Sequence, residues 1–489
     1  MAVGVAWVLG FRILDRITGI ASVMVLARLL VPDDFGLVAL GTSVAAFVEL
    51  LGAFSLDAVL IQKKDATRAD FDTAWTIQVG IGAACATVLA LVAPLAAAFF
   101  RQPDLRVIIT VLAAAMFVDG FANIRIVEFR KLMRFDREFV FMAGRRLTTT
   151  AVTITAAFLL RNHWALVIGI ASGKLVGLAL GYAMRPYRPR FTLASHRELL
   201  HASWWLFMAN LVQFVRMRLS DFVLGRTTTT RIVGSFNLAN EVSSMVSTEV
   251  VAPVNRVALP EFSAIGDPAG IARRFDQLTG QLAIFLIPMG IGLAACARPL
   301  VDLFFGPNWT VAAEVLSILA ISGMVAGLGS NMGVALLAVG HFRTNAALQA
   351  TGAALLIPLL TLGAMLASYR GAAWAMLVAN SLLVVIAAFA LRRILGYRLR
   401  AFAGCMWRPA LCAMLMFTAI QPLLGHPGWF WNVAPEATQL AVVAVVGAAV
   451  YTGAMLLLFV ARGRRDAPEQ MTLRFLRAAL GKVRSRLPG

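Results

Sequence analysis

Residues 26–36 have the sequence LARLLVPDDFG, in which Arg28 ends one apolar run and Gly36 begins the next. The same arrangement returns 198 residues later, where Arg226 and Gly234 keep the eight-residue step between a basic residue and a glycine. A landmark repeated at this distance, in a chain dominated by apolar runs, is typical of a duplicated membrane transporter with its substrate path between the two copies.

Further stretches echo one another in the same order. A proline followed by two phenylalanines recurs at an offset of 205 residues, and a seven-residue lengthening of one connecting loop explains the longer offset. The matching positions are Pro94, Phe99 and Phe100 with Pro299, Phe304 and Phe305. Because six predicted spans separate the echoes, both copies enter the membrane in the same direction, and we expect parallel repeats around a central cavity.

The composition excludes a soluble protein. Hydrophobic residues make up 60% of the 489 residues, charged residues make up 14%, and the mean hydropathy is +0.80. A membrane span needs roughly 20 mainly apolar residues, so the apolar runs predict an all-α polytopic membrane protein with about 14 transmembrane helices. The predicted spans lie near residues 3–30, 36–61, 73–100, 106–127, 139–160, 164–184, 199–225, 232–259, 277–305, 310–339, 345–367, 371–391, 403–424 and 438–461.

These spans predict two parallel six-helix repeats and a C-terminal helix pair. We expect an N-terminal lobe over residues 1–190, a second lobe over 199–395, an additional helix pair over 403–462 and a basic cytoplasmic tail over 463–489. Apolar residues recur at three- and four-residue steps in the tail, a pattern that suits a helix on the anionic inner leaflet. A solvated basic tail is the alternative.

The basic residues predict the orientation. The sequence has 44 lysines and arginines, and most of those outside the spans are on alternate connections and in the tail. Short loops rich in these residues stay in the cytoplasm, so both termini are expected there. The net charge of +19 follows mainly from this asymmetry, and we expect no nucleic-acid partner.

No enzyme motif accompanies the spans. The sequence contains five histidines, but it has no phosphate-binding glycine loop and no nucleophile at motif spacing from a base. Its cysteines, Cys85, Cys296, Cys405 and Cys412, all fall inside predicted spans, which argues against a disulfide framework and a metal site. We therefore expect neither enzyme activity, nor a cofactor, nor a metal.

A polar stripe follows the eighth predicted span at three-, four- and seven-residue steps, which places its members on one side of a helix. The members are Asn237, Asn240, Glu241, Ser244, Thr248 and Asn255. Polar groups inside a membrane are costly and usually face a bundle interior or a wet cavity, so the stripe is expected to line a lumen. Hydrogen bonding between helices in a dry interface is the alternative.

Cations inside the spans are concentrated in the first half. The first span contains Arg12, Asp15 and Arg16 on one face, where Arg12 and Asp15 form an internal ion pair or the surplus positive charge contacts phosphate. In the sixth span, Lys174 lies beside a row of glycines at every fourth residue (169, 173, 177 and 181), which predicts close helix packing. We expect Lys174 to face a cavity, since a lysine at mid-depth needs a partner or water. Arg216 belongs to a polar arc of the seventh span.

Two further arginines, Arg145 and Arg146, lie near the inner end of the fifth span. At least one of them is expected to extend to the lipid headgroups. The basic residues expected to be buried in the spans are matched in number by acidic ones, so the sequence permits full neutralisation. The basic set is Arg12, Arg16, Arg145, Arg146, Lys174, Arg216 and Arg218, and the acidic set is Asp15, Glu49, Asp57, Asp119, Asp221, Glu241 and Glu249.

Several stretches resemble bacterial polysaccharide flippases of the Wzx type, within the multidrug/oligosaccharidyl-lipid/polysaccharide exporter superfamily. The resemblance covers about residues 5–400 and rests on residues 26–36, on Arg130-Lys131-Leu132-Met133-Arg134-Phe135, on Asp221-Phe222-Val223-Leu224-Gly225, and on Leu303-Phe304-Phe305-Gly306-Pro307-Asn308-Trp309. One departure is Phe236, where the pattern has tyrosine. The resemblance implies an alternating-access bundle of two lobes in the bacterial plasma (inner) membrane. It also implies transfer of a polyprenyl-pyrophosphate-linked oligosaccharide to the outer leaflet, for polysaccharide biosynthesis.

The hypothesis for the site combines the resemblance with the polar residues. Arg12, Arg16, Lys174 and Arg216 would hold the pyrophosphate, while Asn240 and Glu241 would meet sugar hydroxyls. Expected partners are the lipid-linked oligosaccharide, membrane lipids, a polysaccharide polymerase and glycosyltransferases. The alternative is a cation-coupled multidrug exporter of the same superfamily, in which Asp57, Glu241 and Glu249 would carry protons or sodium.

Overall fold

The computed structural model describes residues 2–51, 56–63, 65–194, 204–265, 267–425 and 436–461. These residues form helices, turns and irregular connections, and no β-strand occurs among them. The predicted all-α class is therefore confirmed. The chain divides into two compact units: unit 1 covers residues 1–237 with 304–308, and unit 2 covers 238–303 with 309–489.

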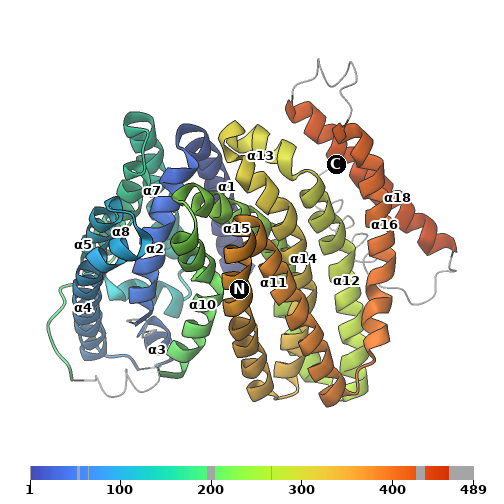
Figure 1. The fold of residues 1–489 in the computed structure, drawn as a ribbon. Coiled ribbons are helices and arrows are strands. Elements are labelled where there is room, and N and C mark those ends of the chain that lie inside the picture. Colours follow the sequence, from blue (N-terminus) through green and yellow to red (C-terminus); the bar gives the residue numbers. More distant parts are fainter. Residues whose placement is uncertain are drawn as a thin grey trace, which may run out of the picture. The chain divides into compact units, whose positions relative to one another are not determined.

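Unit 1 contains the helices of the first predicted lobe and the helix that follows it (Figure 1). Its elements are α1 (Ala2–Leu29), α2 (Pro32–Leu51), α3 (Leu56–Gln62), α4 (Arg68–Phe100), α5 (Asp104–Gly120), η1 (Ile124–Ile126), α6 (Val127–Lys131), α7 (Phe135–Leu160), α8 (Trp164–Met184), α10 (Trp204–Thr227) and the start of α11 (Thr230–Ile265). Neighbours in sequence pack as pairs, α4 with α5 and α7 with α8, and α5 packs on α8. Helix α1 lies along α7.

Unit 2 continues α11 and adds α12 (Pro268–Ala295), most of α13 (Ala297–Phe305), the last residue of η2 (Pro307–Trp309), α14 (Thr310–Ala338), α15 (Phe342–Leu395), α16 (Leu399–Gly425) and α18 (Glu436–Ala461). Helix α15 is broken at Ala367 and Ser368, where Ser368 has φ 52°. Its two arms meet at glycines, because a Cβ on Gly363 would lie 2.4 Å from the carbonyl oxygen of Gly371. The predicted spans over 345–367 and 371–391 correspond to these arms.

Seven described helices are long and apolar enough to cross a membrane, and the bent pair of α5 with η1 and α6 would be an eighth. The number of fourteen spans stays a prediction, and so does the division into lobes at residue 190. The predicted basic tail over 463–489 lies outside the described residues.

Local sequence explains where the helices of unit 1 begin and bend. Thr67 starts α4 with a capping box, in which its side chain accepts from the backbone N–H of Asp70 and the Asp70 carboxylate accepts from that of Thr67. After Gly120 the chain bends by 64° into η1 and α6. Buried Asn123 holds this bend against the end of α8, because its amide donates to the carbonyls of Gly181 (2.9 Å) and Arg185 (2.7 Å).

The two landmark glycines of the repeat contact each other at the starts of α2 and α11. A Cβ on Gly36 would lie 1.9 Å from the carbonyl oxygen of Thr230 and 3.0 Å from the backbone nitrogen of Gly234. In turn, a Cβ on Gly234 would lie 2.0 Å from the carbonyl oxygen of Pro32. Only glycine fits at either position, so the repeated residue is explained by backbone-to-backbone packing.

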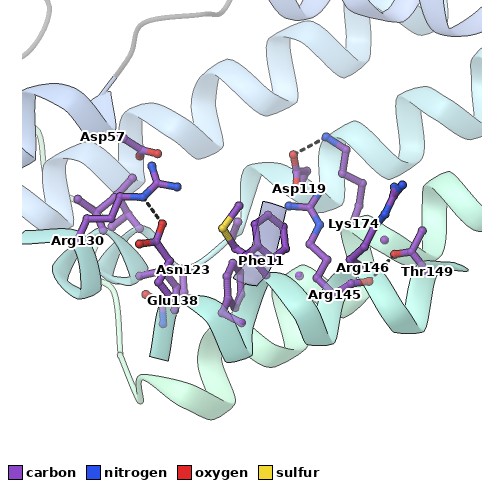
Figure 2. Close-up of a pocket in the computed structure, with 18 of the residues that line it drawn as sticks. Phe11, Asp57, Asp119, Asn123, Arg130, Glu138, Arg145, Arg146, Thr149 and Lys174 are labelled. Carbon is purple, nitrogen blue, oxygen red and sulfur yellow. Dashed lines mark hydrogen bonds and ion pairs between the residues drawn. The ribbon is translucent and has the colours of Figure 1, made fainter. Parts of the chain in front are cut away.

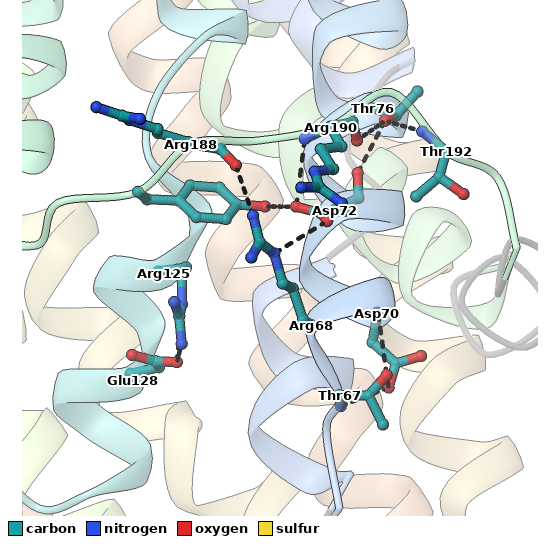
Figure 3. Close-up of polar contacts among 11 residues, drawn as sticks. Thr67, Arg68, Asp70, Asp72, Thr76, Arg125, Glu128, Arg188, Arg190 and Thr192 are labelled. Atoms are coloured by element: carbon teal, nitrogen blue, oxygen red, sulfur yellow. Dashed lines mark hydrogen bonds and ion pairs between the residues drawn. The ribbon is translucent and has the colours of Figure 1, made fainter.

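The segment after α8 is tied to the first turns of α4 (Figure 3). The hydroxyl of buried Tyr187 donates to Asp72 at 2.5 Å, and the Asp72 carboxylate also lies 3.7 Å from Nε of Arg68. Backbone groups add to this connection, since the N–H of Arg190 donates to Asp72 and that of Thr192 donates to the Thr76 hydroxyl. Burial and the neighbouring carboxylate raise the pKa of Tyr187 well above its ordinary value, so its hydroxyl remains a donor.

Replacing Tyr187 by phenylalanine should therefore destabilise unit 1. The change leaves a buried carboxylate without its shortest hydrogen bond, a loss of about 1–3 kcal/mol in the free energy of unfolding. Thermal unfolding of the detergent-purified protein measures the effect. Arg188→Gln, an exposed change in the same segment, is the matched control, and equal melting temperatures for Tyr187→Phe and wild type would contradict the role of this bond.

Candidate functional site

A cavity of about 570 Å³ lies inside unit 1, among α1, α3, α4, α5, α6, α7 and α8 (Figure 2). Its lining is unusually rich in charge for a region built from apolar helices. The basic residues are Arg130, Arg145, Arg146 and Lys174, and the acidic residues are Asp15, Asp57, Asp119 and Glu138. Phe11, Phe141, Met142 and Ile170 supply apolar walls.

Lys174 lies on α8 with its amino group between two carboxylates. Its Nζ is 2.7 Å from Asp119 of α5 and 3.4 Å from Glu49 of α2. The side chain is 22% exposed, so it reaches water through the cavity while most of its stem is covered. The predicted need of this lysine for a partner is thus met by two acidic residues, and its predicted position on a cavity agrees with the structure.

Two more cavity cations have acidic neighbours. Nε of Arg146 is 2.9 Å from Asp15 of α1, in a geometry that makes an ion pair without a hydrogen bond. Nε of Arg130, on α6, donates to Glu138 of α7 at 2.5 Å. The structure therefore pairs Asp15 with an arginine of α7, and the internal pair with Arg12 that the sequence allowed does not form.

Arg145 differs from the other cavity cations. Among the residues that the structure describes, no acidic side chain forms an ion pair with it, and its side chain is exposed to the cavity. The glycine row of α8 lets α7 approach closely, because a Cβ on Gly177 would lie 3.5 Å from Cδ and Nε of Arg145. The Arg145 side chain therefore packs against α8 about one turn from Lys174, and both residues line the cavity (Figure 2).

The predicted cations are only partly brought together. Lys174 lines the cavity, and so does Asp57, which was predicted as an ion-coupling residue. Arg12 and Arg16 lie on α1 outside the lining, Arg12 exposed and Arg16 half-buried, and Arg216 is half-buried on α10. Their role in phosphate binding stays a prediction.

Sequence reasoning missed Arg130 and assigned at least one of Arg145 and Arg146 to the headgroups. One signal was available for the pair. A glycine row such as that of α8 requires a close partner helix, and the antiparallel neighbour α7 places its own residues there.

Unit 2 contains a second cavity of about 360 Å³ between α11, α14 and α15. The polar stripe of α11 supplies Asn240, Ser244, Thr248 and Asn255 to its wall. Across the cavity, the Asn380 amide donates to the Ser322 hydroxyl at 3.0 Å. The described lining residues include no charged side chain.

The predicted ion-coupling residues of α11 and the first member of its polar stripe lie elsewhere. Glu241 and Glu249 are exposed on α11 outside this lining, and Asn237 donates to buried Asp221 within unit 1 at 2.7 Å. In the described part of the chain, no group of three or more histidine, cysteine, aspartate and glutamate residues is placed to hold a metal ion.

Comparison with known proteins supplies a family for this architecture. A family model described as polysaccharide biosynthesis protein matches residues 25–314. The chain is 25% identical over 401 residues to the lipopolysaccharide biosynthesis protein WzxC of Escherichia coli K12, covering 80% of this chain and 81% of that one. It is 23% identical over 378 residues to the teichuronic acid biosynthesis protein TuaB of Bacillus subtilis 168, with coverages of 76% and 78%.

Solved structures share the fold. The lipid II flippase MurJ in an inward closed conformation aligns with a TM-score of 0.73 at 13% identity, over 93% of this chain and all of that one. An inward-facing multidrug resistance transporter of the MATE family aligns with a TM-score of 0.61 at 12% identity, over 78% and 94%. Both are polytopic helical transporters, so the likeness establishes a multi-pass membrane fold.

Proposed function

This chain belongs to the polysaccharide biosynthesis protein family, and we propose on that premise that it transfers a lipid-linked oligosaccharide from one membrane leaflet to the other. The resemblance to flippases of the Wzx type is confirmed by the family match and by the WzxC relative. The relatives and solved neighbours are named as biosynthesis, flippase and transport proteins, in agreement with the prediction that the chain is not an enzyme.

The charged cavity of unit 1 is the observation that carries the proposal. A polyprenyl-pyrophosphate-linked oligosaccharide has an anionic pyrophosphate, a polar glycan and a long apolar tail. When this substrate crosses the membrane, its pyrophosphate needs cationic hydrogen-bond donors in place of bulk water. Guanidinium and ammonium groups form the strongest hydrogen bonds to a phosphate. Arg145 and Lys174 supply these donors from adjacent helices. Both lie in predicted spans, where a charged side chain is costly unless it has a functional partner.

The rest of the substrate would use other surfaces. The uncharged lining of the unit 2 cavity, with Asn240, Ser244 and Thr248, suits sugar hydroxyls, which both donate and accept hydrogen bonds. The tail would stay in the lipid. Arg12, Arg16 and Arg216 are proposed as further phosphate contacts. The proposed direction of transfer is from the cytoplasmic to the outer leaflet, with both termini of the protein in the cytoplasm. A polysaccharide polymerase and glycosyltransferases are the proposed partners.

Leaflet assignment of lipid-linked oligosaccharides tests the function. Spheroplasts with and without this protein would be exposed to a glycosidase or lectin that cannot enter them. We expect the lipid-linked glycan to be accessible with the protein present and to accumulate inaccessibly without it. Unchanged accessibility, together with dye efflux driven by a sodium or proton gradient, would instead establish the multidrug exporter with Asp57, Glu241 and Glu249 as coupling residues.

Arg145→Ala tests the site within the same assay. The variant should lower the rate of leaflet transfer roughly ten- to hundredfold, the loss expected from one charge-assisted hydrogen bond. Its melting temperature should match wild type, because no described carboxylate loses a partner. Arg137→Ala, which removes an exposed arginine of α7 outside the cavity lining, is the control and should transport normally. Normal transport by Arg145→Ala would remove this residue from the site.

A further inference from the structure

The cavity of unit 1 is not a simple cationic pocket, because carboxylates hold most of its cations. Around Lys174 the acidic groups exceed the basic ones: one ammonium contacts both Asp119 and Glu49. Since both carboxylates contact the same Nζ, the contacting oxygens lie within about 6 Å of each other, a separation at which like charges repel each other. An incoming anion therefore competes with two resident anions for one cation.

Each helix packed on α8 contributes to this cluster. Helix α5 supplies Asp119, α2 supplies Glu49, and α7 supplies Arg145 and Arg146 to the same cavity. Asp15 of α1 lies against Arg146 and neutralises it. Next to Glu49 in the sequence, the carbonyl of Val48 accepts a hydrogen bond from the thiol of Cys85 on α4 at 3.5 Å. In the described structure, no second cation is paired with Asp119 or Glu49.

We infer that the Lys174 cluster takes up a proton when a pyrophosphate group binds in the cavity. This inference rests on the proposed function and adds a proton to the substrate-bound state. The binding anion takes the place of Asp119 at the ammonium group. Asp119 then faces Glu49 and the new anion without its contact to the ammonium, while Lys174 is shared between Glu49 and the new anion, and a proton from solvent bridges the two carboxylates or neutralises one of them. The carboxyl O–H bond is the only covalent bond formed, and bulk water or buffer supplies its proton.

The sign of the pH dependence follows from linkage. If the complex holds more protons than the free protein, affinity rises as pH falls, by up to roughly tenfold per pH unit for one proton. Replacing Asp119 by asparagine removes the carboxylate that competes with the pyrophosphate for Lys174, and the same change removes a carboxylate that accepts the proton. Asp119→Asn should therefore bind the anion more tightly than wild type at pH 8 and lose the pH dependence, a gain of affinity that a merely structural carboxylate would not produce.

Calorimetry on the purified full-length protein tests this directly. The probe is citronellyl-pyrophosphoryl-N-acetylglucosamine, whose phosphates are fully ionised between pH 6 and 8. Titration at pH 7 in two buffers of different ionisation enthalpy reports the number of protons exchanged. We expect uptake of about 0.5–1 proton by wild type, from the linkage above. The value should fall to near zero in Asp119→Asn and should also fall in Glu49→Gln.

The control and the contrary outcomes are distinct. Asp104→Asn, at the exposed start of the same helix α5, should keep the wild-type proton number. Binding of the probe to wild type without proton exchange would overturn this inference and leave the proposed function standing. Failure of wild type to bind the probe would overturn the assignment of the cavity to the pyrophosphate, and the inference with it. If Asp119→Asn is poorly folded, the Glu49→Gln variant and the comparison of buffers with the wild-type protein still test whether a proton is taken up on binding.

Discussion

Replacing Lys174 by methionine is expected to reduce leaflet transfer roughly a hundredfold or more, because the change affects both the site and the helices around it. The ammonium group is lost as a donor to the pyrophosphate. At the same time Asp119 and Glu49 lose the cation that lies 2.7 and 3.4 Å from them. Removing one partner of a partly buried ion pair leaves uncompensated charge, so the melting temperature should also fall.

Compensating variants separate these two effects. Adding Asp119→Asn and Glu49→Gln to Lys174→Met removes the uncompensated carboxylates and should restore the melting temperature, while transfer stays lost. Lys174→Arg keeps the charge and should retain part of the transport. The spheroplast assay and thermal unfolding together give both readouts. Wild-type transfer by Lys174→Met would show that this lysine is not part of the substrate path.

The second large effect is expected at the glycine contact between α2 and α11. Gly36→Ala places a methyl group 1.9 Å from the carbonyl oxygen of Thr230, a distance that forces the two helix starts apart. Overpacking of this kind costs about 1–3 kcal/mol in the free energy of unfolding, and backbone atoms cannot rotate away as a side chain can. We expect a lower melting temperature and a smaller monodisperse fraction after detergent extraction.

The reciprocal change and a control make this prediction sharper. Gly234→Ala should have a similar effect, and the double variant should cost less than the two single changes added, because the first methyl group already separates the helices. Gly80→Ala of α4 is the control, since a Cβ there meets no atom within 4 Å. Strict additivity of Gly36→Ala and Gly234→Ala would show that the two glycines do not share one contact.

Much of the architecture could be predicted because helix formation and membrane burial leave periodic signals along a single segment. The break of α15 at Ala367 and Ser368 coincides with the end of the predicted span over 345–367, and four members of the α11 stripe share one cavity wall. The pairing of charges could not be predicted in the same way. Spacing places Arg12, Asp15 and Arg16 on one face of a helix, but it does not say which helix lies opposite.

The partner of Asp15 illustrates this limit. Helix α1 packs along α7, and that tertiary contact brings Arg146 to Asp15 while Arg12 remains exposed. Likewise, the attachment of Asn123 to the end of α8 bends the chain after α5 and places Arg130 at the cavity. Such contacts join residues far apart in the chain, so the local sequence pattern does not predict them.

The equal numbers of acidic and basic side chains in the unit 1 cavity also bear on the membrane as an electrical barrier. A passage with several unpaired cations would concentrate chloride and other small anions, and their leakage would dissipate the membrane potential. With Arg130, Arg146 and Lys174 each held by a carboxylate, a monovalent anion gains little on entering. Under the proposed function, a ligand with several charged oxygens would engage Arg145 and Lys174 together, and we expect the resident carboxylates to disfavour the entry of small anions.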